Sequence, residues 1–146
     1  MATIFDVAKY YLNSIGELTT MKLQKLCYYA QSWSLAWDGE PLFDEDFQAW
    51  ANGPVCPELF QAHSGRFKLP ADFFDGYNFE FSAAQRETLD AIKEYYGKES
   101  SQWLSELSHK EVPWKTARGN TPVGERCSNV ITKDSMQQYY SDLASL

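Results

Sequence analysis

The sequence lacks the segments that would carry the chain into or through a membrane. No uncharged apolar run reaches the roughly 18 residues that a membrane-spanning helix needs. The first residues, MATIFDVAKYYLNS, have no basic segment followed by an apolar run, as a signal peptide would. The three cysteines are an odd number and none is close to another in sequence, so they do not suggest a disulfide framework. We therefore expect a reduced, cytoplasmic protein without membrane contact.

Basic residues and catalytic motifs are also scarce. The chain has 13 Lys and Arg against 20 Asp and Glu, a formal net charge of −7, which disfavours direct nucleic-acid binding and suits a basic partner. No GxSxG, CxxC, HExxH or GxxxxGK[ST] pattern occurs. We expect no enzymatic activity, cofactor or metal. The alternative from the enzyme class is a small metal-dependent hydrolase using His63, His109 and nearby carboxylates.

Aromatic residues, by contrast, are abundant. Five Trp, nine Tyr and nine Phe make up 16% of the chain, which is more rings than a small core requires. Tyr and Trp are also the residues that dominate protein contact sites. The excess of rings therefore favours a protein that acts by binding another protein.

Residues 20–37 form the segment around which we predict the fold to be arranged. One broad helical stripe, at about 100° per residue, holds Leu23, Leu26, Cys27, Ala30, Trp33, Ser34 and Trp37. A second stripe on the opposite side holds Met21, Tyr28 and Leu35. The positions left for water are Lys22, Gln24, Lys25, Gln31 and Ser32. A helix with two apolar faces is normally buried between other elements, so we predict a central buried helix. The alternative is that the second stripe meets a partner.

The rest of the chain predicts a mainly α fold with a minor short-strand component. Apolar spacing with capping and helix-ending residues indicates helices over residues 3–15, 57–64, 83–96, 101–108, 113–118 and from 133 onward. Short strands are expected at 47–50 and 78–81, and a loop at 120–129. The faces assigned to the core include Trp37, Tyr95 and Leu143. There is no internal repeat or linker, so we expect one compact domain over residues 1–146.

Charge is unevenly distributed along the chain. Five acids cluster without an intervening base: Asp38, Glu40, Asp44, Glu45 and Asp46. Bases are concentrated later, at Lys110, Lys115, Arg118, Arg126 and Lys133. The acidic cluster is either a solvated loop or a contact that attracts a basic partner surface and speeds association.

The segment SHKEVPWKTARG places four functional side-chain types in one short element: His109, Glu111, Trp114 and Arg118. One interpretation is a polar clasp that closes the fold, in which Glu111 holds Arg118 or His109. The other is that Trp114 and Arg118, both frequent interface residues, are presented to a partner.

Alternation within residues 47–50 sends Phe47 and Ala49 to one face of a strand, and Gln48 and Trp50 to the other. Both rings cannot point into one core, so one of them is available to a partner unless a second layer covers it. We favour as partner contacts Asp44, Glu45, Asp46 and Phe47. Further candidates are Trp50, Trp114 and Arg118. The competing view is that Trp50 and Trp114 pack against each other and complete the fold.

Two long stretches resemble a known family. LQKLCYYAQSWSLAWDGEPLFDEDFQAWANGPVCPEL and YYGKESSQWLSELSHKEVPWKTAR are similar to the Panacea domain family, the phage-associated SocA-like and GepA-like antitoxin domains, in a likeness spanning about residues 3–120. The resemblance implies a mostly helical antitoxin domain that binds and neutralises a toxin encoded by the adjacent gene. In one branch of the family, the domain is a proteolytic adaptor that delivers its toxin to a Clp-type protease. Many relatives carry an N-terminal DNA-binding region. This chain begins directly with the domain, so we expect no repression of its own operon.

Overall fold

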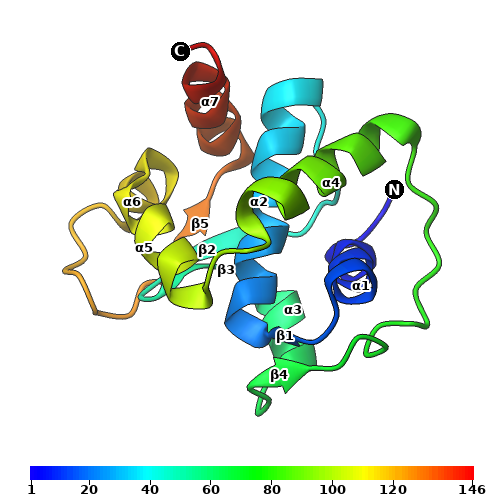
Figure 1. Ribbon diagram of the computed structural model, residues 1–146. Helices are drawn as coiled ribbons and strands as arrows, with labels where there is room; N and C mark the ends of the chain where they lie inside the picture. Colours follow the sequence, from blue (N-terminus) through cyan, green and yellow to red (C-terminus); the bar gives the residue numbers. More distant parts are fainter.

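The computed structural model describes residues 1–146 and contains seven helices and five short strands (Figure 1). The helices are α1 (Ile4–Ile15), α2 (Thr20–Asp38), α3 (Pro57–His63), α4 (Ala83–Tyr96), α5 (Ser101–Lys110), α6 (Val112–Arg118) and α7 (Lys133–Ala144). The strands are β1 (Leu18–Thr19), β2 (Phe47–Trp50), β3 (Gly53–Val55), β4 (Lys68–Leu69) and β5 (Val130–Ile131). The predicted mainly α fold with a minor strand component is confirmed.

Helix α2 is the central element, with α1, α4, α5 and α7 packed around it. It begins where the Thr19 hydroxyl accepts a hydrogen bond from the Lys22 amide, and it ends at Gly39, whose φ of 68° lies in the left-handed region that glycine adopts freely. Most of its apolar stripe is buried, as Leu26 and Trp33 illustrate, while Trp37 at the C-terminal end is exposed. The prediction of a central buried helix is therefore confirmed.

The polar side chains of α2 are a correction to the sequence-based picture, because Gln24, Lys25, Gln31 and Ser32 are buried rather than exposed to water. Two of them bind distant backbone at two points each. Gln24 Oε1 accepts from the Cys56 amide at 2.9 Å while its Nε2 donates to the Cys56 carbonyl at 3.2 Å. Gln31 Oε1 accepts from the Leu42 amide at 2.7 Å and its Nε2 donates to the Phe43 carbonyl at 2.8 Å. Such pairs satisfy buried polar groups on both sides and fix two loops to the helix.

The second stripe of α2 also packs inside the protein. Tyr28 and Leu35 are both buried, and only Met21 remains half-exposed. The alternative that this stripe meets a partner is therefore wrong for Tyr28 and Leu35.

A three-stranded antiparallel sheet lies beside α2, in the order β3-β2-β5. Its register pairs Gln48 with Val55 and Phe47 with Ile131. Phe47 and Ala49 are buried while Gln48 and Trp50 are half-buried, so the predicted alternation is confirmed.

The strand expected at residues 78–81 is wrong. This segment pairs with no other strand and instead runs past α1, where Phe81 packs edge-on against Tyr10 at 5.9 Å. The small second sheet pairs β1 with β4, Leu18 facing Leu69. The aromatic residues of this segment predict a strand, but Phe81 is buried by packing rather than by sheet formation and Phe79 remains exposed.

Candidate partner-binding site

The acidic turn, residues 44–46, has exposed carboxylates and is anchored to the rest of the protein at two points. Asp44 and Asp46 are exposed and Glu45 is half-buried. Lys133, the first residue of α7, lies 2.7 Å from Asp46 Oδ1 and donates to the Asp44 carbonyl at 2.9 Å. Glu45 Oε1 accepts from the Ile4 amide at 3.0 Å, which places a negative charge at the N-terminus of α1. Both aspartates are therefore exposed to a partner, Asp44 without an ion-pair partner and Asp46 paired with Lys133.

Phe47, the fourth favoured contact, lies in the core. Its side chain is 1% exposed and its ring packs edge-on against Tyr28, with centroids 5.3 Å apart. The surface of the turn is therefore charged and not aromatic.

Trp114 and Arg118 are buried too, and both fasten α6 to strand β2. Trp114 Nε1 donates to the Trp50 carbonyl at 2.9 Å, and Arg118 Nη1 donates to the Ala49 carbonyl at 2.9 Å. Arg118 Nη2 reaches the carbonyls of Pro122 and Glu125 at 2.8 and 2.7 Å. The guanidinium also lies 4.8 Å from the centre of the Trp114 ring. These contacts match the interpretation of the segment as a clasp. Trp114 reaches the backbone carbonyl of Trp50, while the Trp50 ring packs on Phe60 and the Trp114 ring on His109.

Glu111 holds neither Arg118 nor His109, which corrects the expected pairing within the clasp. Its Oε1 accepts from the Tyr29 hydroxyl at 2.7 Å and from the Tyr140 hydroxyl at 2.8 Å. His109 instead stacks on Trp114, with ring centroids 4.2 Å apart. Burial raises the pKa of Glu111 above its ordinary value, although the two hydroxyls partly oppose that shift. The carboxyl joins α6 to α2 and α7.

We predict that Glu111→Gln makes unfolding less dependent on pH. Both tyrosine bonds end on one oxygen, which an amide can replace without removing either acceptor. The folded pKa of Glu111 is raised, so the native state binds more protons than the unfolded state just above pH 4.5. Wild-type stability should therefore fall as the pH rises from there through the folded pKa. Urea denaturation between pH 4 and 7 should show that fall weakened in Glu111→Gln, and an unchanged pH slope would contradict it.

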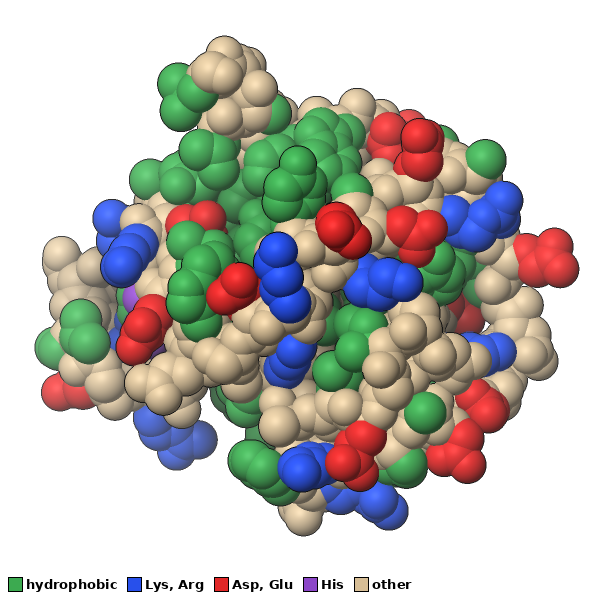
Figure 2. All heavy atoms as spheres, in the orientation of Figure 1, with side chains coloured by type: hydrophobic (Ala, Val, Ile, Leu, Met, Phe, Trp, Pro, Cys, Tyr) green, Lys and Arg blue, Asp and Glu red, His purple; other side chains and the backbone are tan.

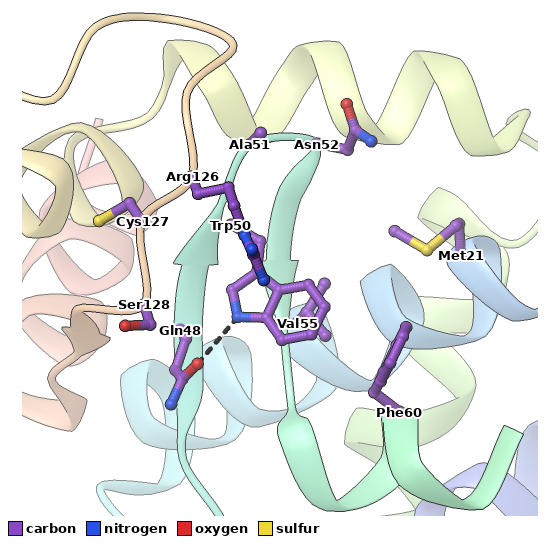
Figure 3. Close-up of a pocket in the computed structure, with 10 residues that line it drawn as sticks. All are labelled: Met21, Gln48, Trp50, Ala51, Asn52, Val55, Phe60, Arg126, Cys127 and Ser128. Carbon is purple, nitrogen blue, oxygen red and sulfur yellow. Dashed lines mark hydrogen bonds between the residues drawn. The ribbon is translucent and has the colours of Figure 1, made fainter. Parts of the chain in front are cut away.

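Of the three aromatic residues predicted to contact a partner, Phe47, Trp50 and Trp114, only Trp50 is partly exposed. It lines a cavity of about 550 Å³ with Val55, Phe60 and Met21, and its Nε1 donates to Gln48 Oε1 at 2.8 Å (Figure 3). The other wall comes from the loop after α6, and its residues are Arg126, Cys127 and Ser128. In Figure 3 the Arg126 side chain extends from that loop toward the indole of Trp50. Sequence reasoning identified Trp50 but not this wall, because the loop has no periodic pattern.

A second hollow, the apolar groove, lies where α2, α4 and α7 meet. It encloses about 390 Å³ and is lined by Trp33, Trp37, Ile92, Tyr95, Tyr96, Leu143 and Ala144. Trp37, Tyr95 and Leu143 are 46%, 68% and 39% exposed, which corrects their assignment to the core. Figure 2 shows the corresponding apolar patch between α4 and α7. Adjacent residues on a helix point about 100° apart, and here Tyr96 packs on Tyr29 while Tyr95 is exposed.

Histidine and carboxylate residues do not converge in the structure. His63 is buried, and its Nε2 lies 3.1 Å from the Gln24 amide nitrogen. Because that nitrogen donates, His63 accepts there, consistent with the lowered pKa that burial and nearby Lys25 give it. No group of three or more His, Cys, Asp or Glu is arranged to hold a metal ion. None of the helices is long and apolar enough to cross a membrane.

Comparison with known proteins identifies relatives of this chain. The family model described as "Antitoxin SocA-like, Panacea domain" matches residues 23–115. Antitoxin SocA of Caulobacter vibrioides (strain NA1000 / CB15N) is 27% identical over 133 residues, covering 80% of this chain and 71% of that protein. No solved structure matches the chain. The matched residues run from the central helix to the clasp.

Proposed function

Because the chain belongs to the SocA-like antitoxin family with a Panacea domain, we propose that it neutralises a protein toxin by binding it directly. The observation that carries the proposal is the family match over residues 23–115, which includes most of α2, the acidic turn, Trp50 and Trp114, and ends before Arg118. We further propose that residues 1–146 act as one domain and that the toxin is encoded by the adjacent gene.

The surface of the protein supports inhibition by contact. Acids exceed bases in the whole chain, giving a formal net charge of −7, and the acidic turn concentrates exposed carboxylates at Asp44 and Asp46. Such charge attracts a basic partner over distances of about a Debye length, roughly 8 Å at physiological salt. Trp50, with its half-buried indole at a cavity wall, supplies an aromatic contact of the kind that dominates binding energy.

Co-expression with the product of the adjacent gene tests the function. The toxin alone should stop growth, and the two proteins together should restore growth and co-purify as a stable complex. An adjacent gene product that neither binds this protein nor is neutralised by it would overturn the proposal.

Reversing the charge of the acidic turn should slow association with the toxin. The variant Asp44→Lys/Asp46→Lys leaves Glu45 and its hydrogen bond to α1 intact. Its stability should be nearly unaffected, because exposed ion pairs contribute little to the free energy of unfolding. Stopped-flow or surface-binding kinetics should show a several-fold lower association rate at low salt, with the difference shrinking as salt is added.

The matched control is Asp72→Lys/Glu80→Lys, which changes the net charge equally at two exposed acids outside the turn. If both double variants slow association to the same extent, net charge alone steers the toxin. If the variant of the turn binds at the wild-type rate, the contact surface lies elsewhere.

A further inference from the structure

The floor of the apolar groove is made of packed aromatic rings. Trp33 contacts Trp37 at 4.8 Å and Tyr140 at 5.4 Å between ring centroids, and Tyr96 stacks on Tyr29 at 4.3 Å. The Trp33 indole N–H already donates to the Tyr96 hydroxyl at 3.0 Å. All seven residues of the lining are hydrophobic, so the groove favours apolar side chains. Because Trp33 and Tyr96 are held by this packing, the floor needs little ordering when the groove is filled.

Exposed acids accompany the exposed apolar residues of the groove. Trp37, Tyr95 and Leu143 are each next in sequence to an exposed acid, respectively Asp38, Glu94 and Asp142. Figure 2 shows mostly acidic side chains around the apolar patch.

The helices that form the groove also carry bases, and most of these are engaged elsewhere. On α2, Lys25 is buried and Lys22 donates to the Gly97 carbonyl. Arg86 and Lys93 lie on α4, and Lys133 of α7 is paired with Asp46. The acids at the end of α2 also continue along the chain through Glu40 into the acidic turn. The groove is therefore linked along the chain to the segment already proposed to attract the toxin.

We propose that the apolar groove receives apolar side chains, of the Leu, Ile, Met or Phe type, from a segment of the toxin that also carries Lys or Arg beside them. This inference rests on the proposed function and adds the place and chemistry of the anchor. The acidic border sets it apart from two other occupants. A second copy of the chain would bring the same acids together, and an anionic membrane surface would be repelled.

The test is the affinity of the cognate toxin for Trp37→Ser/Tyr95→Ser. Tyr95 is 68% and Trp37 46% exposed, and neither belongs to the buried core cluster, so the variant should fold with an unchanged circular dichroism spectrum. Loss of an interface anchor should weaken binding about 30-fold or more. The control, Phe67→Ser, removes an aromatic ring that is 74% exposed outside the groove and should bind as the wild type does. Equal affinity of all three proteins would overturn the groove as the anchor site while leaving the antitoxin function intact.

A peptide experiment decides the chemistry of the groove even if the toxin does not bind the wild type. The probe is a synthetic amphipathic helix of Leu and Lys, compared by calorimetry with its counterpart of Leu and Glu. The Leu/Lys peptide should bind the wild type at least tenfold more tightly than Trp37→Ser/Tyr95→Ser, and the Leu/Glu peptide should not bind. Equal binding of the Leu/Lys peptide to both proteins would contradict the proposal. A concentration-dependent dimer of the wild type that the double substitution abolishes would also contradict the proposal, because a second copy of the chain would then occupy the groove.

Discussion

Lys25→Met is expected to raise the free energy of unfolding at neutral pH by roughly 4 kcal/mol. On folding, the wild-type lysine must either lose its proton or bury a charged amine, and methionine does neither. Lys25 is 0% exposed and lies beneath the β2–β3 turn, where its Nζ donates to the Pro54 carbonyl at 3.2 Å. The backbone approaches it closely, because a Cβ on Gly53 would lie 2.6 Å from Lys25 Cε. No carboxylate forms an ion pair with it.

The pH dependence of that gain follows from the pKa of Lys25. Burial lowers it from 10.5 to about 7, while the unfolded chain keeps its proton to about pH 10.5. The unfolded state therefore binds more protons between these values, and wild-type stability should rise with pH across that window. The advantage of Lys25→Met should be greatest at pH 6 and shrink toward pH 10.

Urea denaturation at pH 6, 8 and 10 measures this difference. Methionine is unbranched and apolar, so it can follow much of the path of the lysine stem. The control is Lys98→Met, an exposed substitution expected to change stability by no more than about 0.5 kcal/mol. A Lys25→Met protein less stable than the wild type at pH 6 would show that the bond to Pro54 outweighs the burial of the amine.

Arg118→Ala is expected to destabilise the protein by about 3 kcal/mol or more, because it removes charge-assisted hydrogen bonds to three carbonyls. Those carbonyls belong to Ala49 in β2 and to Pro122 and Glu125 in the loop that leads to the Trp50 cavity. The side chain is 3% exposed, so water does not readily replace it. Hydrogen exchange over residues 119–129 should accelerate along with the loss of global stability.

The matched variants for Arg118 separate charge from geometry. Arg118→Lys keeps the charge but loses the planar fork that reaches β2 and the loop together, so it should recover only part of the loss. Arg126→Ala removes an exposed arginine from the same loop and should leave stability nearly unchanged. If Arg118→Lys were as stable as the wild type, the three-point geometry would not be what closes the clasp.

Local signals explain why most helices could be predicted from sequence. The Ser82 hydroxyl accepts from the Gln85 amide and the Gln85 side chain accepts from the Ser82 amide, a capping box encoded within four residues. The alternation of β2 was similarly visible from Phe47 to Trp50. Caps and periodicity need no knowledge of tertiary structure.

Distant partners explain what the sequence did not reveal. The polarity of Gln24 and Gln31 predicts exposure to water, yet both side chains bind backbone groups. Gln24 binds Cys56, and Gln31 binds Leu42 and Phe43. Glu111 likewise finds its hydroxyl partners on α2 and α7 and not within its own segment. The apolar groove could not be predicted for a related reason. Trp37, Tyr95 and Leu143 each fit the apolar face of an amphipathic helix, and their exposure follows only from how the three helices pack.

Neutralisation by direct binding is tested most directly by the amount of toxin that remains when growth is restored. The toxin should be expressed with and without this protein, in hosts with and without a Clp-type protease, and followed by immunoblot after synthesis is stopped. Direct binding predicts restored growth in both hosts, with the toxin persisting at an undiminished level in complex with this protein. A toxin that disappears only when this protein and the protease are both present, with no rescue in the protease-deficient host, would contradict direct binding and establish delivery for degradation.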